Sequence, residues 1–195
     1  MKDIVVDRIT VTFGENTVLS DFSLIIPAGQ TSCIMGQSGC GKTTLGNVLL
    51  GLIPPDKGSV RGIPENVAAV FQENRLCDNF SALANLRAVS KTADEEKLKE
   101  ELLALDIDPT DRKPVRELSG GQQRRVAIAR ALCTDADFTV LDEPFKGLDE
   151  ATAQKVMDRV KTRTKDKTVL LITHAPEQAS FFGGNTVRMQ SKDKQ

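Results

Sequence analysis

The sequence predicts an α/β fold in which a core of parallel strands is preceded by a small antiparallel sheet and interrupted by a helical insertion. Four short apolar runs, at 31–35, 67–71, 138–141 and 169–173, have the length of buried strands, and a glycine-rich loop follows the first of them. Residues 4–13 alternate between apolar and polar side chains, which is typical of a strand with one solvated face.

Composition limits the classes of function. The 195 residues are enough for one domain with a proper core, and the formal net charge of −1 without a basic block gives no sign of nucleic-acid binding. The amino-terminal residues do not resemble a signal peptide, and no apolar stretch reaches the roughly 20 residues of a membrane helix. The four cysteines lack CxxC pairs and zinc-type spacing, so we expect reduced thiols in a cytosolic protein.

The chain before the glycine-rich loop reads as strands and turns. After the strand at 4–13, a turn signal occupies 14–16, further strand-like pieces lie at 18–19 and 22–26, and Pro27, Ala28 and Gly29 turn the chain again. We therefore predict an antiparallel β part over 1–30. Phe13 stands just before the first glycine turn, where an aromatic ring either packs in the sheet or stacks on a base.

Residues 36–43 have the pattern G-x-x-x-x-G-K-T between a predicted strand and a predicted helix at 44–50. This strand–loop–helix context is the one that a phosphate-binding loop requires. Its glycines allow the backbone N–H groups to point inward, and the helix adds the positive end of its dipole. Lys42 is placed to reach the β- and γ-phosphates, and the Thr43 hydroxyl to bind Mg²⁺, so we expect a nucleoside triphosphate here.

The strand at 67–71 ends at Gln72, which places a polar side chain at the edge of the sheet where ligands bind. Helix-like stretches follow at 82–89 and 93–105, the second with Leu98, Leu102 and Leu105 on one stripe. We predict a single domain, 1–195, with a catalytic core at 31–72 and 136–195 and a helical subdomain at 73–135.

A second candidate anion site lies inside the helical subdomain. Ser119 is suited to cap a helix that begins near it, and Gly120 and Gly121 leave the first N–H groups of that helix open. A single triphosphate does not need two such sites from one chain. From spacing alone, an ordinary capped helix explains the pattern equally well.

Acidic residues and the only histidine follow two later strands. Asp142 and Glu143 come at the end of the strand at 138–141, where one carboxylate suits Mg²⁺ and the next suits activation of water. The alternative is a solvated acidic turn. His174 follows the strand at 169–173, a position that favours contact with phosphate or water over a structural role. Between them, Asp149 precedes a predicted helix at 150–163.

Together these motifs make the chain resemble an ATP-binding cassette (ABC) ATPase, the nucleotide-binding subunit of an ABC transporter. Residues 118–122 read LSGGQ and match the family signature in full, and the motifs follow in family order over essentially the whole length. The resemblance implies a P-loop NTPase fold with a RecA-like parallel core, ATP and Mg²⁺ as ligands, and ATP hydrolysis.

The resemblance also assigns roles. Glu143, His174, Lys42 and Gln72 take the catalytic positions, while Thr43, Gln72 and Asp142 are placed at the metal. The implied nucleotide-binding residues are Phe13, Gly36, Gln37, Ser38, Gly39, Cys40, Gly41, Lys42, Thr43, Thr44, Ser119, Gly120, Gly121, Gln122 and Asp149. Phe13 stands where tyrosine is common in the family, and Lys146 where a small residue is usual.

In this family two subunits pack head to tail as a dimer, and each ATP lies between the loop of one chain and the signature of the other. The expected partners are a second copy, transmembrane permease subunits and a solute-binding protein, with no nucleic acid and a cytoplasmic position on the inner face of the membrane. The short insertion resembles that of bacterial importers, and 71–76 is similar to nitrate and sulfonate subunits. The alternatives are a soluble cassette ATPase in repair, translation or regulation, and an inactive ATP binder.

Overall fold

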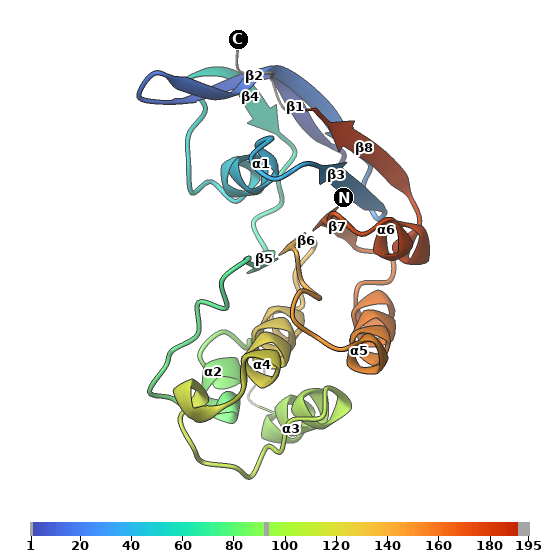
Figure 1. The fold of residues 1–195 in the computed structure, drawn as a ribbon. Helices are drawn as coiled ribbons and strands as arrows, with labels where there is room; N and C mark the ends of the chain where they lie inside the picture. Colours follow the sequence, from blue (N-terminus) through green and yellow to red (C-terminus); the bar gives the residue numbers. More distant parts are fainter. Residues whose placement is uncertain (1, 92–93, 191–195) are drawn as a thin grey trace. The chain divides into compact units, whose positions relative to one another are not determined.

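The computed structural model describes residues 2–91 and 94–190. The chain divides into two compact units, each of which combines segments distant in sequence. Unit 1 contains the chain up to 69, residues 137–143 and the chain from 166 onward, whereas unit 2 contains 70–136 and 144–165. Figure 1 labels the helices and strands of both.

Unit 1 begins with the antiparallel sheet, whose strand order is β2-β1-β4. The predicted strand at 4–13 is β1 (Ile4–Phe13), and the two pieces predicted after the first turn form one strand, β2 (Asn16–Ile26). The third strand, β4 (Lys57–Arg61), was not predicted, because its sequence is short, polar and glycine-containing. A side chain at Gly58 would meet the Arg8 carbonyl oxygen at 2.4 Å, so only glycine lets these two strands approach.

The second sheet has the strand order β5-β6-β7-β3-β8. Its strands are β3 (Thr31–Gly36), β5 (Val67–Val70), β6 (Phe138–Asp142), β7 (Thr168–Ile172) and β8 (Asn185–Met189). The pairings β3–β7 and β6–β7 are parallel, as the buried apolar runs predicted, and β8 also pairs with β3 in parallel. In consequence the carboxyl ends of β3, β6 and β7 meet at one edge of the sheet.

Helix α1 (Lys42–Leu49) packs on this sheet and completes the core of unit 1. A methyl group at Gly46 would lie 3.3 Å from Ile172 and 3.4 Å from Val140, so glycine lets the helix backbone approach β6 and β7 closely. The side chains of Leu45 and Leu49 are fully buried in the same cluster. Helix α6 (Pro176–Phe182) follows β7. Packing of this kind fixes the start of α1, which is where the glycine-rich loop ends.

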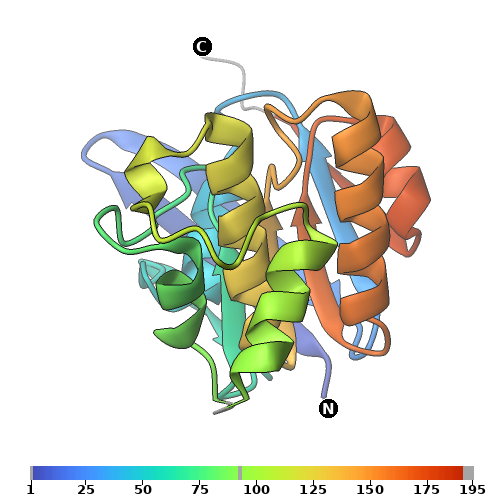
Figure 2. The same ribbon diagram turned by 90° about the horizontal axis from the view of Figure 1, so that it is seen from below.

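Unit 2 is helical and contains α2 (Ala82–Arg87), α3 (Glu95–Ala104), the 3₁₀ turn η1 (Val115–Glu117), α4 (Gly120–Cys133) and α5 (Glu150–Arg163). Helix α4 contacts α2, α3 and α5, and Figure 2 shows α3, α4 and α5 in view together. The two helix-like stretches at 82–89 and 93–105 correspond to α2 and α3, and residue 93 lies outside the described residues.

Helix α5 packs with the helices of unit 2, although the sequence-based division grouped 136–195 with the strands. The physical reason is a buried ion cluster. Arg159 donates through Nε and Nη2 to the Glu101 carboxylate at 2.9 and 2.7 Å, and Arg163 Nε lies 3.2 Å from it. Only 4% of the Glu101 side chain is exposed, so α3 and α5 are held together by a desolvated charge.

Candidate functional site

The glycine-rich loop connects β3 to α1 within unit 1. Gly36 has a φ of 158°, and a side chain there would meet the Met189 carbonyl oxygen at 2.4 Å and the Cys40 sulfur at 2.7 Å. Gly41, the N-cap of α1, has a φ of 98°, and a side chain there would meet Leu19 at 2.7 Å. The tight backbone that the glycines were predicted to allow is therefore present, with the open start of α1 beside it.

Lys42 is the first residue of α1, and its ammonium group folds back over the loop. Its Nζ donates to the carbonyl oxygens of Gly36 and Gln37 at 2.8 and 2.7 Å and lies 3.8 Å from the Cys40 sulfur. These are short charge-assisted bonds to groups of the loop itself. They hold the positive charge at the loop, where an anion entering between the N–H groups would meet it. Cys40 itself is buried, with only 5% of its surface exposed.

Thr43 and Asp142 meet across unit 1. The Thr43 hydroxyl, in the first turn of α1, donates to Asp142 Oδ2 at 2.7 Å, and Asp142 is the last residue of β6. A hydroxyl and a carboxylate in contact make an oxygen-only donor pair, which is what Mg²⁺ prefers. The residues present therefore fit the magnesium site that the sequence predicted.

Glu143 and His174 form the second side-chain pair of this edge. Because β6 and β7 are parallel with Asp142 opposite Ile172, the residues that follow each strand are neighbours. His174 Nδ1 donates to both carboxylate oxygens of Glu143 at 2.9 Å. The His174 side chain is 69% exposed and that of Glu143 only 13%. The carboxylate is thus oriented by a histidine that remains open to a ligand.

The backbone at Glu143, and at Thr173 just before His174, is also constrained. Glu143 has a φ of +48°, in the left-handed region that a residue with a Cβ rarely adopts, and its N–H donates to the Ile172 carbonyl at 2.9 Å. Thr173, fully buried, accepts the N–H of Ala175 at 3.1 Å and donates its own N–H to Ile34. Strain of about 1–3 kcal/mol at such a residue persists only where surrounding contacts enforce it, and it is common at functional sites.

Unit 2 contains the signature segment. Ser119 is the N-cap of α4, and its hydroxyl accepts the N–H of Gln122 at 3.3 Å while the Gln122 side chain accepts the N–H of Ser119 at 2.9 Å. The cap at Ser119 is as predicted. The reciprocal role of Gln122 was missed, although the spacing S-x-x-Q is itself the signal of a capping box.

Asp149 lies in the same unit as the signature. It is the N-cap of α5, and its Oδ1 accepts the Thr152 N–H at 3.0 Å, a bond that lowers the pKa of the Asp149 carboxyl below its ordinary value. A methyl group at Gly121 would lie 3.6 Å from Leu148, so the first turn of α4 contacts the chain just before Asp149. The signature and Asp149 therefore both lie at helix starts.

Two further predicted residues lie at exposed positions. Phe13 ends β1 in unit 1 with 48% of its surface exposed, which excludes full burial in the sheet and leaves the ring available for stacking. Gln72 follows β5 in unit 2 and is exposed. The structure thus brings Lys42, Thr43 and Asp142 together with the Glu143–His174 pair, and assigns Gln72, Asp149 and the signature to the other unit.

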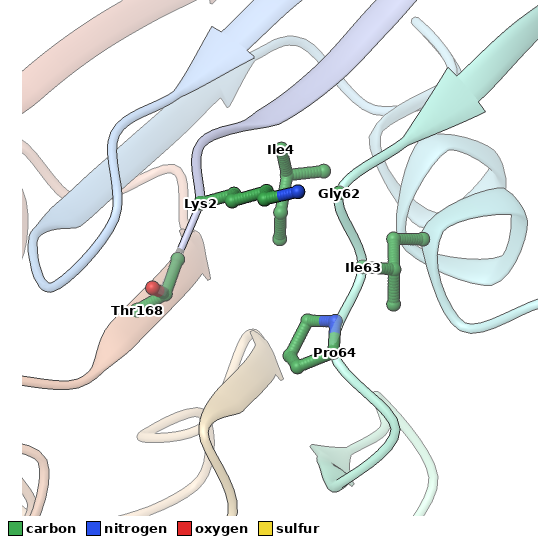
Figure 3. A pocket seen from close by; sticks show the side chains of 6 residues that line it. All are labelled: Lys2, Ile4, Gly62, Ile63, Pro64 and Thr168. Carbon is green, nitrogen blue, oxygen red and sulfur yellow. The ribbon is translucent and has the colours of Figure 1, made fainter.

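Hollows lie at two places among the described residues of unit 1. The first, of about 640 Å³, adjoins the glycine-rich loop and is lined by Met35, Gly36, Gln37, His174, Pro176, Arg188, Met189 and Gln190. Arg188, which the sequence did not single out, adds a second basic side chain beside His174. The other hollow, of about 240 Å³, lies near Thr168, the first residue of β7, and Figure 3 shows its lining. Since His174 follows the opposite end of β7, this second hollow is not part of the candidate site.

The loop, the capped helix and the acidic strand end define a P-loop nucleotide-binding protein of the α/β class. The sequence matches the family described as ABC transporter over residues 19–146. The chain belongs to this family, which confirms the resemblance drawn from its motifs.

Curated relatives and solved structures agree. The chain is 31% identical to the "Ergothioneine transport ATP-binding protein EgtV" of Helicobacter pylori, covering 98% of this chain and 99% of that one. It is 34% identical to the "Taurine import ATP-binding protein TauB" of Roseobacter denitrificans, covering 88% and 69%. It is also 33% identical to the "Fe(3+) ions import ATP-binding protein FbpC" of Escherichia coli O157:H7 over 95% of this chain, but spans only 58% of that relative.

Among solved structures, the "Dimeric Structure of MJ0796, a Bacterial ABC Transporter Cassette" superposes with a TM-score of 0.86 at 28% identity, covering 96% of this chain and 94% of that one. The same cassette in a "post-hydrolysis state" bound to ADP and Pi gives 0.84 at 28% identity, covering 97% and 96%. These superpositions confirm the predicted fold class.

Proposed function

We propose that this chain is the ATP-hydrolysing subunit of a bacterial ABC importer. The observation that carries the proposal is the joint placement of the Thr43–Asp142 and Glu143–His174 pairs at the sheet edge where the glycine-rich loop ends. Such an edge combines an anion cradle with a candidate metal site and a candidate base, the parts that phosphoryl transfer to water uses. The import names of the relatives and the ADP–Pi state of MJ0796 support it.

Each candidate site residue of unit 1 has a definite task in this proposal. Lys42, now bonded to the Gly36 and Gln37 carbonyls, would transfer its hydrogen bonds to the β- and γ-phosphates of ATP. Thr43 and Asp142 would hold Mg²⁺, whose charge stabilises the phosphate oxygens. Glu143 would accept a proton from the attacking water, and His174 would orient that carboxylate. Phe13 would stack on the base.

The proposal includes a second copy of the chain. In unit 2 the start of α4 is capped by its own Ser119 and Gln122, and the first turn of α5 by Asp149. The starts of α1 and α4 are both candidate anion sites, and one triphosphate does not need two of them from the same chain. We therefore propose that the signature serves the ATP bound by the other copy. The dimeric form of MJ0796 supports a head-to-tail pair. Gln72 would lie near Mg²⁺ and link the site to the permease.

Within the part of the chain that the structure describes, no helix is both long and apolar enough to cross a bilayer. We propose that separate permease subunits supply the membrane passage and that this chain docks on them from the cytoplasm, with a solute-binding protein in the full system. Taurine and aliphatic sulfonates in the names of relatives support the predicted subgroup for small anions.

The test is Mg²⁺-dependent ATPase activity together with association. Glu143→Gln should lower kcat by at least about a hundredfold while ATP still binds, because the base is lost but the cradle remains. Glu96→Gln, an exposed glutamate of α3, serves as the matched control and should keep wild-type turnover. Purification from native membranes should recover permease subunits. Recovery with ribosomes or DNA instead would contradict the transport proposal, and wild-type turnover in Glu143→Gln would contradict the catalytic assignment.

A further inference from the structure

Arg124, on α4, is a buried arginine that the family motifs leave without a role. Only 4% of the residue is exposed. Its guanidinium Nε donates to the Pro144 carbonyl at 2.8 Å, and Nη1 donates to the Phe71 carbonyl at 2.5 Å and lies 3.4 Å from that of Gln72. Nη1 also lies 3.3 Å from the side-chain oxygen of Asn74. All these groups belong to unit 2.

The carbonyls that Arg124 holds lie beside the residues proposed for catalysis. Phe71 directly precedes Gln72, and Pro144 directly follows Glu143 in the chain. One guanidinium therefore fixes the backbone next to Gln72 and the backbone next to the candidate base. Because Arg124 sits five residues after Ser119 on the helix that carries the signature, it ties both segments to that helix.

The rest of the loop after Gln72 is fastened to the same helix. Arg130 of α4 donates to the carbonyls of Arg75 and Asn74 at 2.9 and 3.3 Å. Residues 71–81 lie in no helix or strand, so side-chain donors supply bonds that a regular element would otherwise make. Arg75 has a φ of +45° and lies over the Phe71 ring at 3.8 Å, so the loop is held in a strained and specific shape.

The far end of the loop joins the chain that leads into the signature. The Val115 N–H donates to the Phe80 carbonyl at 2.8 Å, and the Arg116 N–H donates to that of Asp78 at 3.2 Å. The Arg116 side chain also bonds Asn79. The loop from Gln72 to Phe80 is thus connected at both ends to the segment 115–130, which contains the signature.

We propose that Arg124 is a positioning residue that keeps Gln72 and the chain after Glu143 in register with the signature helix. The inference rests on the proposed function, since it concerns residues assigned to that site. Through its carbonyl bonds, Arg124 would then keep the backbone beside Gln72 from shifting relative to the start of α4. Arginine is required because its planar fork serves carbonyls in two directions, whereas the ammonium of lysine is a single point of donation.

The test separates positioning from stability. Arg124→Gln should lower kcat for ATP about tenfold while KM changes less than about twofold, because the phosphate loop lies in unit 1 and is untouched. In a Glu143→Gln background, it should weaken ATP-driven dimerisation by about tenfold. Arg124→Lys, which keeps the charge without the fork, should recover stability but remain at least about threefold slow. If Arg124→Gln does not fold, Arg124→Lys carries the test.

The matched control is Arg163→Gln, which removes an arginine of the same unit that forms an ion pair with Glu101 and donates to the Leu132 carbonyl. It should lower stability and leave kcat near that of the wild type. Wild-type kcat and dimerisation in the Arg124 variants would overturn the inference, as would an equal loss of kcat in Arg163→Gln at equal destabilisation. If Glu143→Gln alone fails to dimerise with ATP, the proposed function fails first, so the two failures are distinguishable.

Discussion

Replacing Glu101 with glutamine tests the ion cluster that joins α3 to α5. The wild-type carboxylate accepts a two-pronged bond from Arg159 and a contact from Arg163 while only 4% of its side chain is exposed. Glutamine has nearly the same shape but carries no charge, and its amide NH₂ would face guanidinium donors. The change therefore removes the charge pairing and leaves the volume almost unchanged.

The expected loss follows from the exposure of the three side chains. Breaking a buried ion pair by removing one partner costs about 3–5 kcal/mol when the remaining charge stays buried. Here the side chains of Arg159 and Arg163 are 31% and 37% exposed, so both can regain water after the change. We therefore expect Glu101→Gln to lower the free energy of unfolding by about 2–3 kcal/mol, or the midpoint by about 5–10 °C.

Chemical denaturation followed by helical circular dichroism measures this loss. Glu100→Gln, an exposed neighbour on α3, is the control and should change the free energy of unfolding by less than about 0.5 kcal/mol. A Glu101→Gln variant as stable as the wild type would refute the reasoning, because the cluster would then add nothing to the contact between α3 and α5.

Three other predictions concern single side chains. Thr43→Ala should weaken ATP binding in the presence of Mg²⁺ more than ATP binding without metal, because it removes the hydroxyl beside Asp142. Calorimetry with and without Mg²⁺ measures both affinities. Equal losses of affinity would argue against the metal role. Burial raises the pKa of the Cys33 thiol to about 11 from 9.0, so the folded chain retains this proton more tightly than the unfolded chain. The free energy of unfolding should therefore fall as pH rises from 9 to 11, by up to about 1.4 kcal/mol per pH unit. Denaturation at a series of pH values should show a smaller slope for Cys33→Ala. An unchanged slope would exclude the thiol as its source. Asn85→Ala should lower the free energy of unfolding by about 2–3 kcal/mol, because the fully buried amide of Asn85 accepts from the Cys77 N–H and donates to the Cys77 carbonyl. A loss below about 0.5 kcal/mol in chemical denaturation would contradict this.

The sequence could predict what depends on local pattern. The alternation in β1, the apolar runs of the parallel sheet and the Ser119 cap are short-range features, and each is where the pattern indicated. The glycine-rich loop was equally accessible, because its spacing directly encodes a backbone shape.

Features that depend on distant partners could not be read in the same way. The strand β4 exists because β1 accepts it as a neighbour, not because its own residues favour a strand. The left-handed backbone of Glu143 and the burial of Arg124 are likewise set by contacts far along the chain. Arg124 shows the limit most clearly: the first arginine after LSGGQ reads as a solvated charge until the carbonyls beside Gln72 and Glu143 are placed around it.

The most direct test of the shared site mixes two defective chains. Ser119→Arg disrupts the signature and leaves the phosphate loop intact. Lys42→Ala disrupts the phosphate loop and leaves the signature intact. If each ATP lies between two copies, the mixed dimer regains one complete site. Equimolar mixing should then restore ATP turnover and nucleotide trapping, neither of which either variant shows alone. Random pairing makes about half of the dimers mixed, so the recovered activity should reach about half that of one wild-type site per dimer. A mixture as inactive as its two components, under conditions where mixed dimers form, would contradict a site shared between copies.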